Sequence, residues 1–155
     1  MHWYGDEMKA EAFLAHLGFG EKAQRVSIHT QDEMASVIEH LEHWMRLFGF
    51  LHKDIYAARL IVREAVSNAL LHGNRNDSAK QVDVNYMVTP NGVVAEVLDQ
   101  GTGFNPDAVP NQFAEENRGH PCAQGVFLMR MYSTWVYFNK TGNRVVLCRR
   151  RTESR

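Results

Sequence analysis

The stretch Arg63-Glu-Ala-Val-Ser-Asn-Ala-Leu-Leu-His-Gly-Asn-Arg-Asn76 decides how the chain folds and where its chemistry lies. Glu64, Asn68 and His72 recur there at every fourth position. At about 100° per residue, this spacing places a carboxylate, an amide and an imidazole along one stripe of a helix. The stretch therefore predicts a helix from about residue 54 to residue 72, ended by Gly73. Its apolar residues gather on a roughly opposite face: Ile55, Ala58, Val62, Val66 and Ala69.

A second motif distinguishes this stripe from an ordinary solvated helix face. The sequence Asp99-Gln-Gly101-Thr-Gly103-Phe directly follows an apolar run that is typical of a strand. A carboxylate followed by two alternating glycines suits a ligand that a side chain and the backbone both approach, because glycine has no side chain to clash. Together the two motifs indicate a functional site far more specifically than either does alone.

The rest of the chain is predicted to alternate between helices and strands. Thr30-Gln-Asp-Glu33 is a capping box, in which both side chains bond free backbone donors, and it begins a helix that Gly49 ends. Residues 104–123 lack periodicity and are predicted to form a long loop, of a length that often serves as a lid. The other expected elements are a weak helix over 7–17, strands over 25–29, 82–88, 93–98, 134–138 and 145–149, and a helix over 125–131.

Composition and charge narrow the possible functions. The 155 residues fall within the usual size of one domain, and the net charge of −1 gives no general attraction to nucleic acid or membranes. The two cysteines lie far apart without metal-site spacing, which fits a reducing compartment. No apolar run is long enough to span a bilayer and no signal-peptide pattern is present, so a cytoplasmic protein is predicted. We interpret Arg149-Arg150-Arg151 as a soluble tail.

The motifs resemble those of the GHKL ATPases, which include gyrase, the heat-shock chaperone, histidine kinases and the mismatch-repair ATPase. Glu64-xxx-Asn68-xxx-His72-Gly73, then Asp99-x-Gly101-x-Gly103, then a loop and a helix start with a glycine follow the family's order. The resemblance covers roughly residues 24–150 and is closest to the small anti-sigma-factor serine/threonine kinases of partner-switching systems. It implies an α/β fold, a two-layer sandwich with a mixed, mostly antiparallel sheet covered by helices. Residues 21–155 would form one ATP-binding domain with a lid at 104–123, and residues 1–20 a leader.

The resemblance and the chemistry of the residues together suggest a role for each site residue. Asp99 would accept from the exocyclic amine of adenine, and Asn68 would give Mg²⁺ an oxygen ligand. Glu64 would act as the catalytic base toward an attacking hydroxyl. The other expected nucleotide contacts are backbone at Gly101, Gly103 and the helix start at Gly125, together with Arg118 before the second glycine box and His72 near the helix end or lid.

The sequence also departs from the family pattern. The second glycine box reads Ala123-Gln124-Gly125, so one glycine of the usual pair is an alanine. Relatives often carry a threonine near the last strand that helps to hold adenine, and the matching position is interpreted as Val146. These two departures favour nucleotide binding over efficient catalysis.

Three functions are compatible with these residues. The first is an ATP- and Mg²⁺-dependent serine/threonine kinase that acts as an anti-sigma factor and phosphorylates a small antagonist protein. The second is a binding module that uses nucleotide to control its affinity for a partner. The third is a histidine kinase catalytic domain acting in trans, which ranks last because no dimerising phosphoacceptor helix is evident before the core. The expected partners are the antagonist, a sigma factor and a second copy in a homodimer, without direct contact to nucleic acid or membrane.

Overall fold

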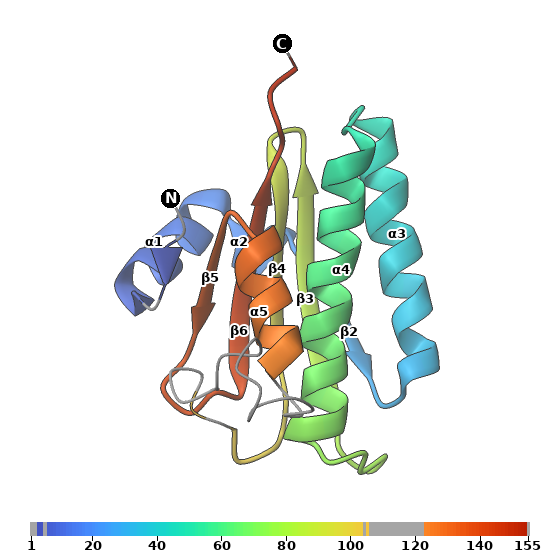
Figure 1. Cartoon of the computed structure of the whole chain (residues 1–155), viewed down its shortest axis with the longest axis vertical. Coiled ribbons are helices and arrows are strands. Elements are labelled where there is room, and N and C mark those ends of the chain that lie inside the picture. The colour runs from blue at the N-terminus through green and yellow to red at the C-terminus, as the bar shows by residue number, and fades with distance from the viewer. Residues whose placement is uncertain (1–2, 5, 104, 106–122, 155) are drawn as a thin grey trace.

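A computed structural model gives the fold of the chain, and it describes residues 3–4, 6–103, 105 and 123–154. Four longer helices and a central sheet make up most of the described part (Figure 1). The elements are β1 (Trp3–Tyr4), α1 (Glu7–Leu17), α2 (Phe19–Lys22), β2 (Gln24–Ile28), a 3-10 turn (Gln31–Glu33), α3 (Met34–Leu47), α4 (His52–Asn68), a π-helical turn (Ala69–Gly73), β3 (Val82–Thr89), β4 (Gly92–Leu98), α5 (Ala123–Tyr132), β5 (Trp135–Phe138) and β6 (Arg144–Arg150).

The sheet has six strands in the order β1-β5-β6-β4-β3-β2. Its neighbouring strands are antiparallel, except that β1 runs parallel to β5. Because β6 lies between β5 and β4, the end of β4 at Leu98 pairs with the start of β6 at Arg144. The loop that precedes β6 is therefore brought next to Asp99. This arrangement confirms the predicted α/β fold with a mixed, mostly antiparallel sheet covered by helices.

The main core lies between one face of the sheet and the helices α3, α4 and α5, which cover it (Figure 1). The strands expose alternate residues to this face, since side chains on a strand point to opposite sides in turn. Each buried aliphatic side chain contributes about 1.5–3 kcal/mol relative to exposure. The fully buried members of this core include Val82 and Val84 of β3, Leu41 of α3, Ile61 and Val62 of α4 and Leu147 of β6.

The opposite face of the sheet packs against α1 and α2. Leu14 and Phe19 contact a second cluster that contains Tyr137 and Val146. Asp6 caps α1 by accepting a hydrogen bond from the backbone N–H of Lys9, at 3.1 Å. The helix predicted over 7–17 is thus present, with N-terminal residues packed on the sheet. The division into a leader over 1–20 and a domain over 21–155 stays a prediction.

The start of α3 differs from the predicted capping box. A 3-10 turn precedes the helix, and the Thr30 side chain makes no capping bond to the backbone. Instead the Thr30 hydroxyl donates to the Glu33 carboxylate at 3.3 Å. The two side chains therefore bond each other rather than the backbone.

The three consecutive arginines near the C-terminus are not a free tail. Arg149 pairs with the fully buried Asp54 at the start of α4, with 2.9 Å between Nη2 and Oδ1. Arg151 donates to the carbonyl oxygens of Phe48 (2.7 Å) and Gly49 (2.8 Å) in the connection between α3 and α4. The interpretation as a soluble tail is therefore wrong for two of the three arginines, whose partners lie about a hundred residues upstream in sequence.

Within the described ranges, no helix is both long enough and apolar enough to cross a membrane.

Candidate functional site

Two of the three stripe residues lie together on α4. Glu64 and Asn68 are half-buried and one turn apart, so they project from the same side of the helix. Between them, Ala65 and Val66 are buried in the core. The apolar side of α4 thus fixes the helix against the sheet and orients the two polar side chains.

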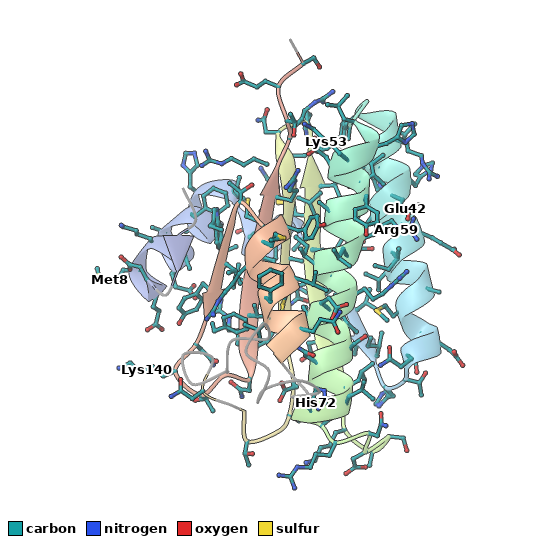
Figure 2. All side chains as sticks on the ribbon, viewed as in Figure 1. Met8, Glu42, Lys53, Arg59, His72 and Lys140 are labelled. Atoms are coloured by element: carbon teal, nitrogen blue, oxygen red, sulfur yellow. The ribbon has the colours of Figure 1, made fainter. Side chains whose placement is uncertain are left out.

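His72 lies beyond the end of α4. The residues after Asn68 form a π-helical turn, in which the N–H of Asn74 bonds the carbonyl of Ala69 at 2.8 Å. The predicted stripe therefore runs from α4 into this turn. His72 lies half-buried at the lower end of α4 (Figure 2). It is not among the residues that line the cavity between α4 and Asp99.

Asp99 follows the last residue of β4 and is anchored on two sides. Its backbone N–H donates to the carbonyl of Asn143 at 2.9 Å, and its Oδ1 accepts from the N–H of Gly101 at 2.8 Å. The carboxylate also lies against Gly73, where a Cβ would overlap it. The helical segment ends at Gly73, as predicted, although Gly73 has no positive φ. Its lack of a side chain gives Asp99 room.

The two glycines of the strand end pack against the protein's own backbone. A Cβ at Gly101 would overlap the carbonyl oxygen of Gly73, and one at Gly103 would overlap that of Thr141. Gly103 also has a φ of 78°, which side-chain-bearing residues rarely adopt. From the sequence, both glycines are predicted to let a ligand approach the backbone. The structure shows that they join the end of β4 to the α4 terminus and to the loop before β6.

Gly125 lies in the first turn of α5, directly over the two polar residues of α4. A Cβ added there would lie 2.9 Å from Nδ2 of Asn68 and 3.1 Å from Oε2 of Glu64. The first four N–H groups of a helix have no intrahelical partner, and Gly125 is the third residue of α5. Backbone donors, a carboxylate and an amide therefore meet at one place.

A cavity of about 20 Å³ connects the two motifs. This is room for a water molecule, and a purine is larger, so lining side chains must shift when a base enters. The cavity is lined by Ala65, Asn68, Ala69 and Gly73 from α4 and its π-helical turn, Val97 and Asp99 from the β4 end, Met129 from α5, and Phe138, Gly142, Asn143, Arg144 and Val145 around the turn into β6.

Burial raises the pKa of both site carboxyls. For Glu64, loss of water contact raises the pKa, and the positive charge of Arg63 offsets only part of this. For Asp99, burial again raises the pKa, against the opposing effects of the Gly101 N–H and the charge of Lys80. Perturbed carboxyls that line or adjoin a cavity are characteristic of functional sites.

The chemistry of Asn68 fits the expected metal. Its Nδ2 is buried without a hydrogen-bond partner in the described part of the chain, so no bond there fixes this nitrogen. Mg²⁺ keeps several waters and phosphate oxygens and takes few protein ligands, so one amide oxygen suits it. The described residues include no group of three or more His, Cys, Asp or Glu side chains that could hold a metal ion.

Sequence reasoning missed Asn74, which is buried just after the motif helix. Its Nδ2 donates to the carbonyl of Gln81 at 2.9 Å, and its Oδ1 accepts from the N–H of Gln100 at 2.8 Å. Asn74 thereby ties the end of α4 to the residue beside Asp99. The only sequence signal for it was its position directly after the motif's glycine.

The position assigned to the family's adenine-binding threonine needs correction. Val146 is buried in the cluster under α1, on the sheet face away from the cavity. Its neighbour Val145 lines the cavity together with Asp99. Alternation along β6 makes Val145, and not Val146, the residue that faces the cavity, so Val146 is no departure there.

Two predicted features fall outside the described residues. These are Arg118 and the lid over 104–123, of which only Asn105 and the backbone of Ala123, the first residue of α5, are described.

Comparison with protein families matches residues 29–149 to the histidine kinase-like ATPase domain. The match covers well over half of the chain and includes both motifs, α5 and most of β6. A comparison with curated proteins finds no match. The chain belongs to the histidine kinase-like ATPase domain family, and it is an ATP-binding module of the GHKL type.

Proposed function

We propose that this histidine kinase-like ATPase domain is a serine/threonine protein kinase that acts as an anti-sigma factor. The observation that carries the proposal is the placement of Glu64. Its carboxylate is half-buried, has a raised pKa, and lies with Asn68 against the first turn of α5. A base works best when its pKa approaches the working pH, and burial shifts Glu64 in that direction.

The residues would divide the work of ATP binding. Asp99 would accept from the amine of adenine, and the free N–H groups at the start of α5 would bind phosphate oxygens. Asn68 would give Mg²⁺ an oxygen ligand, and the bound ion would offset negative charge on the phosphates. Arg118 is proposed to contribute to phosphoryl transfer, and His72 to support the helix end or the lid.

In the proposed transfer, the hydroxyl oxygen of an acceptor serine or threonine forms a bond to the γ-phosphorus of ATP. The bond from that phosphorus to its bridging oxygen breaks, and ADP leaves with the electron pair. Glu64 accepts the proton of the hydroxyl. Loss of this group should therefore slow the chemical step without weakening ATP binding.

The proposed acceptor is a small antagonist protein, and the proposed regulatory target is a sigma factor that the chain would sequester. The support is the resemblance of the motifs to the anti-sigma-factor kinases. The same resemblance supports a cytoplasmic location and a homodimer. No direct contact with nucleic acid is proposed, since the net charge is −1.

The competing proposal is a nucleotide-controlled binding module. It rested on Ala123 and Val146, and the location of Val146 away from the cavity removes one of these two supports. Ala123 is the remaining departure.

Phosphate transfer to a purified antagonist-type protein with one acceptor serine tests the proposal. We expect Glu64→Gln to lower turnover by about 10²–10⁴-fold with little change in ATP affinity. The matched control, Arg63→Gln, changes the adjacent side chain and should leave most turnover intact. If the unaltered chain binds ATP but phosphorylates no serine or threonine, the binding-module function is correct.

A further inference from the structure

One amide organises the whole loop between β5 and β6. Oδ1 of Asn139 accepts from the N–H groups of Gly142 (2.8 Å) and Arg144 (3.1 Å). Nδ2 of Asn139 donates to Oδ1 of Asn143 at 2.7 Å. These three side-chain bonds add to two backbone bonds of the same loop, from Asn139 N–H to the Arg144 carbonyl at 3.1 Å and from Gly142 N–H to the Asn139 carbonyl at 3.0 Å.

This loop supports the Asp-x-Gly-x-Gly strand end at two points. The carbonyl of Asn143 accepts from the backbone N–H of Asp99 at 2.9 Å. The carbonyl of Thr141 lies where a side chain of Gly103 would be. Asn139 therefore controls the two carbonyl groups on which the strand end rests, through the side chain of Asn143 and the backbone on either side of it.

The same loop forms one wall of the cavity. Gly142 and Asn143 line it together with Asp99, and Val145 follows on the same wall. Figure 2 shows Lys140, within this loop, at the same lower end of the molecule as His72. A shift of the loop would thus move the wall and the backbone of Asp99 together.

Base selection depends on where the Asp99 carboxylate points. Adenine presents an amine donor at its six-position, whereas guanine presents a carbonyl oxygen that a carboxylate repels. Hydrogen bonds weaken steeply when their angle is poor, so a displaced carboxylate loses adenine affinity and, with it, discrimination.

We propose that Asn139 is a positioning residue for base selection: it fixes the carbonyl of Asn143, which holds the backbone of Asp99 so that the carboxylate meets the amine of adenine. The inference rests on the proposed role of Asp99 in nucleotide binding. It assigns to Asn139 no contact with the nucleotide itself.

The test is titration calorimetry of the full chain with Mg·ADP and Mg·GDP. We expect Asn139→Ala to lower the ratio of ADP to GDP affinity by about tenfold, equivalent to one moderate hydrogen bond. Asn139→Asp keeps the acceptor for both N–H groups but loses the donor to Oδ1 of Asn143, so it should lower the ratio less than Asn139→Ala does. The matched control is Asn91→Ala in the β3–β4 hairpin at the other end of the sheet, where the contacts are a bond to Thr89 and one from Arg151. This control should leave the ratio unchanged.

A merely structural role for Asn139 predicts a lower melting temperature with an unchanged affinity ratio, and that outcome overturns the proposal. If Asn139→Ala does not fold, Asn143→Ala replaces it, since this change removes only the bond from Nδ2 of Asn139 and keeps the carbonyl. Asn143→Ala and Asn139→Asp both lose this bond, so an unchanged ratio in both folded variants then overturns the proposal. Asp99→Asn tests the role of Asp99 in base selection separately from the role of Asn139. If Asp99→Asn keeps the ratio, the role of Asp99 fails; if only Asn139→Ala keeps it, the positioning role fails.

Discussion

Polar side chains at the two ends of α4 differ in how fully they are hydrogen-bonded. Lys53 and His72, labelled in Figure 2, mark these ends. At the N-terminal end, Asp54 is fully buried and its oxygens accept from the N–H and hydroxyl of Thr152, each at 2.8 Å, and from Arg149. At the C-terminal end, the amide of Asn68 has a buried Nδ2 without a partner among the described residues. One helix thus carries a satisfied polar group and an unsatisfied one.

The pKa values follow the same division. Burial alone would raise the pKa of Asp54, but the bonds from Thr152 and Arg149 outweigh it and lower the pKa. At the other end, burial prevails and raises the pKa of Glu64 and Asp99. A polar group that the fold fully satisfies stabilises the fold, whereas one that it leaves partly satisfied remains available to a ligand. The comparison indicates that the N-terminal end of α4 is built for stability and the C-terminal end for function.

The largest expected effect is at the stabilising end. Asp54→Ala should lower the free energy of unfolding by about 3–5 kcal/mol, because it leaves Arg149 and Thr152 without their buried partner. Urea denaturation measures this loss. Glu64→Ala is the matched change at the other end and should cost far less. Equal losses for the two variants would contradict the proposed division of the helix.

The next effect concerns binding at the functional end. Asp99→Asn should weaken ATP by about 1–3 kcal/mol, the cost of mispairing a buried polar group. The free energy of unfolding without nucleotide should not fall, because a buried charge is removed at the same time. Calorimetry and denaturation of the same variant measure both quantities. Unchanged ATP affinity in a folded Asp99→Asn variant would remove Asp99 from the binding site.

Most of the fold could be predicted because it depends on local patterns. Alternation located the strands, and the spacing of apolar residues located α3 and α4 to within a few residues. What failed depended on details of backbone geometry. The π-helical turn after Asn68 has no pattern of its own in the sequence.

The site could be predicted in its residue types but less well in its geometry. Asp99 and Asn68 do line one cavity, and Gly125 lies against Asn68 and Glu64. The resemblance assigns the position of the family's adenine-binding threonine to Val146, whereas strand alternation could have assigned it to Val145. The role of Arg149 could not be foreseen, since its partner lies 95 residues away in sequence and only the fold brings the two together.

A smaller effect tests how far the stabilising end extends toward the C-terminus. Arg151→Ala should lower the free energy of unfolding by about 1 kcal/mol, because its half-exposed guanidinium donates to the carbonyl oxygens of Phe48, Gly49 and Pro90. Arg150→Ala, a change at an exposed neighbour, is the control and should have little effect. A loss as large for Arg150→Ala would point to general charge rather than to these hydrogen bonds.

The smallest expected effect is on the pH dependence of the free energy of unfolding, which has opposite signs for Asp54 and Glu64. Asp54 has a lowered pKa, so its contribution to stability is present above the unfolded value of 3.8 and is lost as the pH falls through the folded value. Glu64 has a raised pKa, so the folded state binds more protons than the unfolded state above 4.5, and stability falls as the pH rises through the folded value. Denaturation of the nucleotide-free chain across this range should show both slopes. Asp54→Asn should reduce the loss of stability as the pH falls, and Glu64→Gln should reduce the loss of stability as the pH rises. Both substitutions leave the charges of Arg149 and Arg63 unchanged. If Glu64→Gln instead changes the loss of stability as the pH falls, the carboxyls at the two ends of α4 do not affect stability with opposite pH dependence.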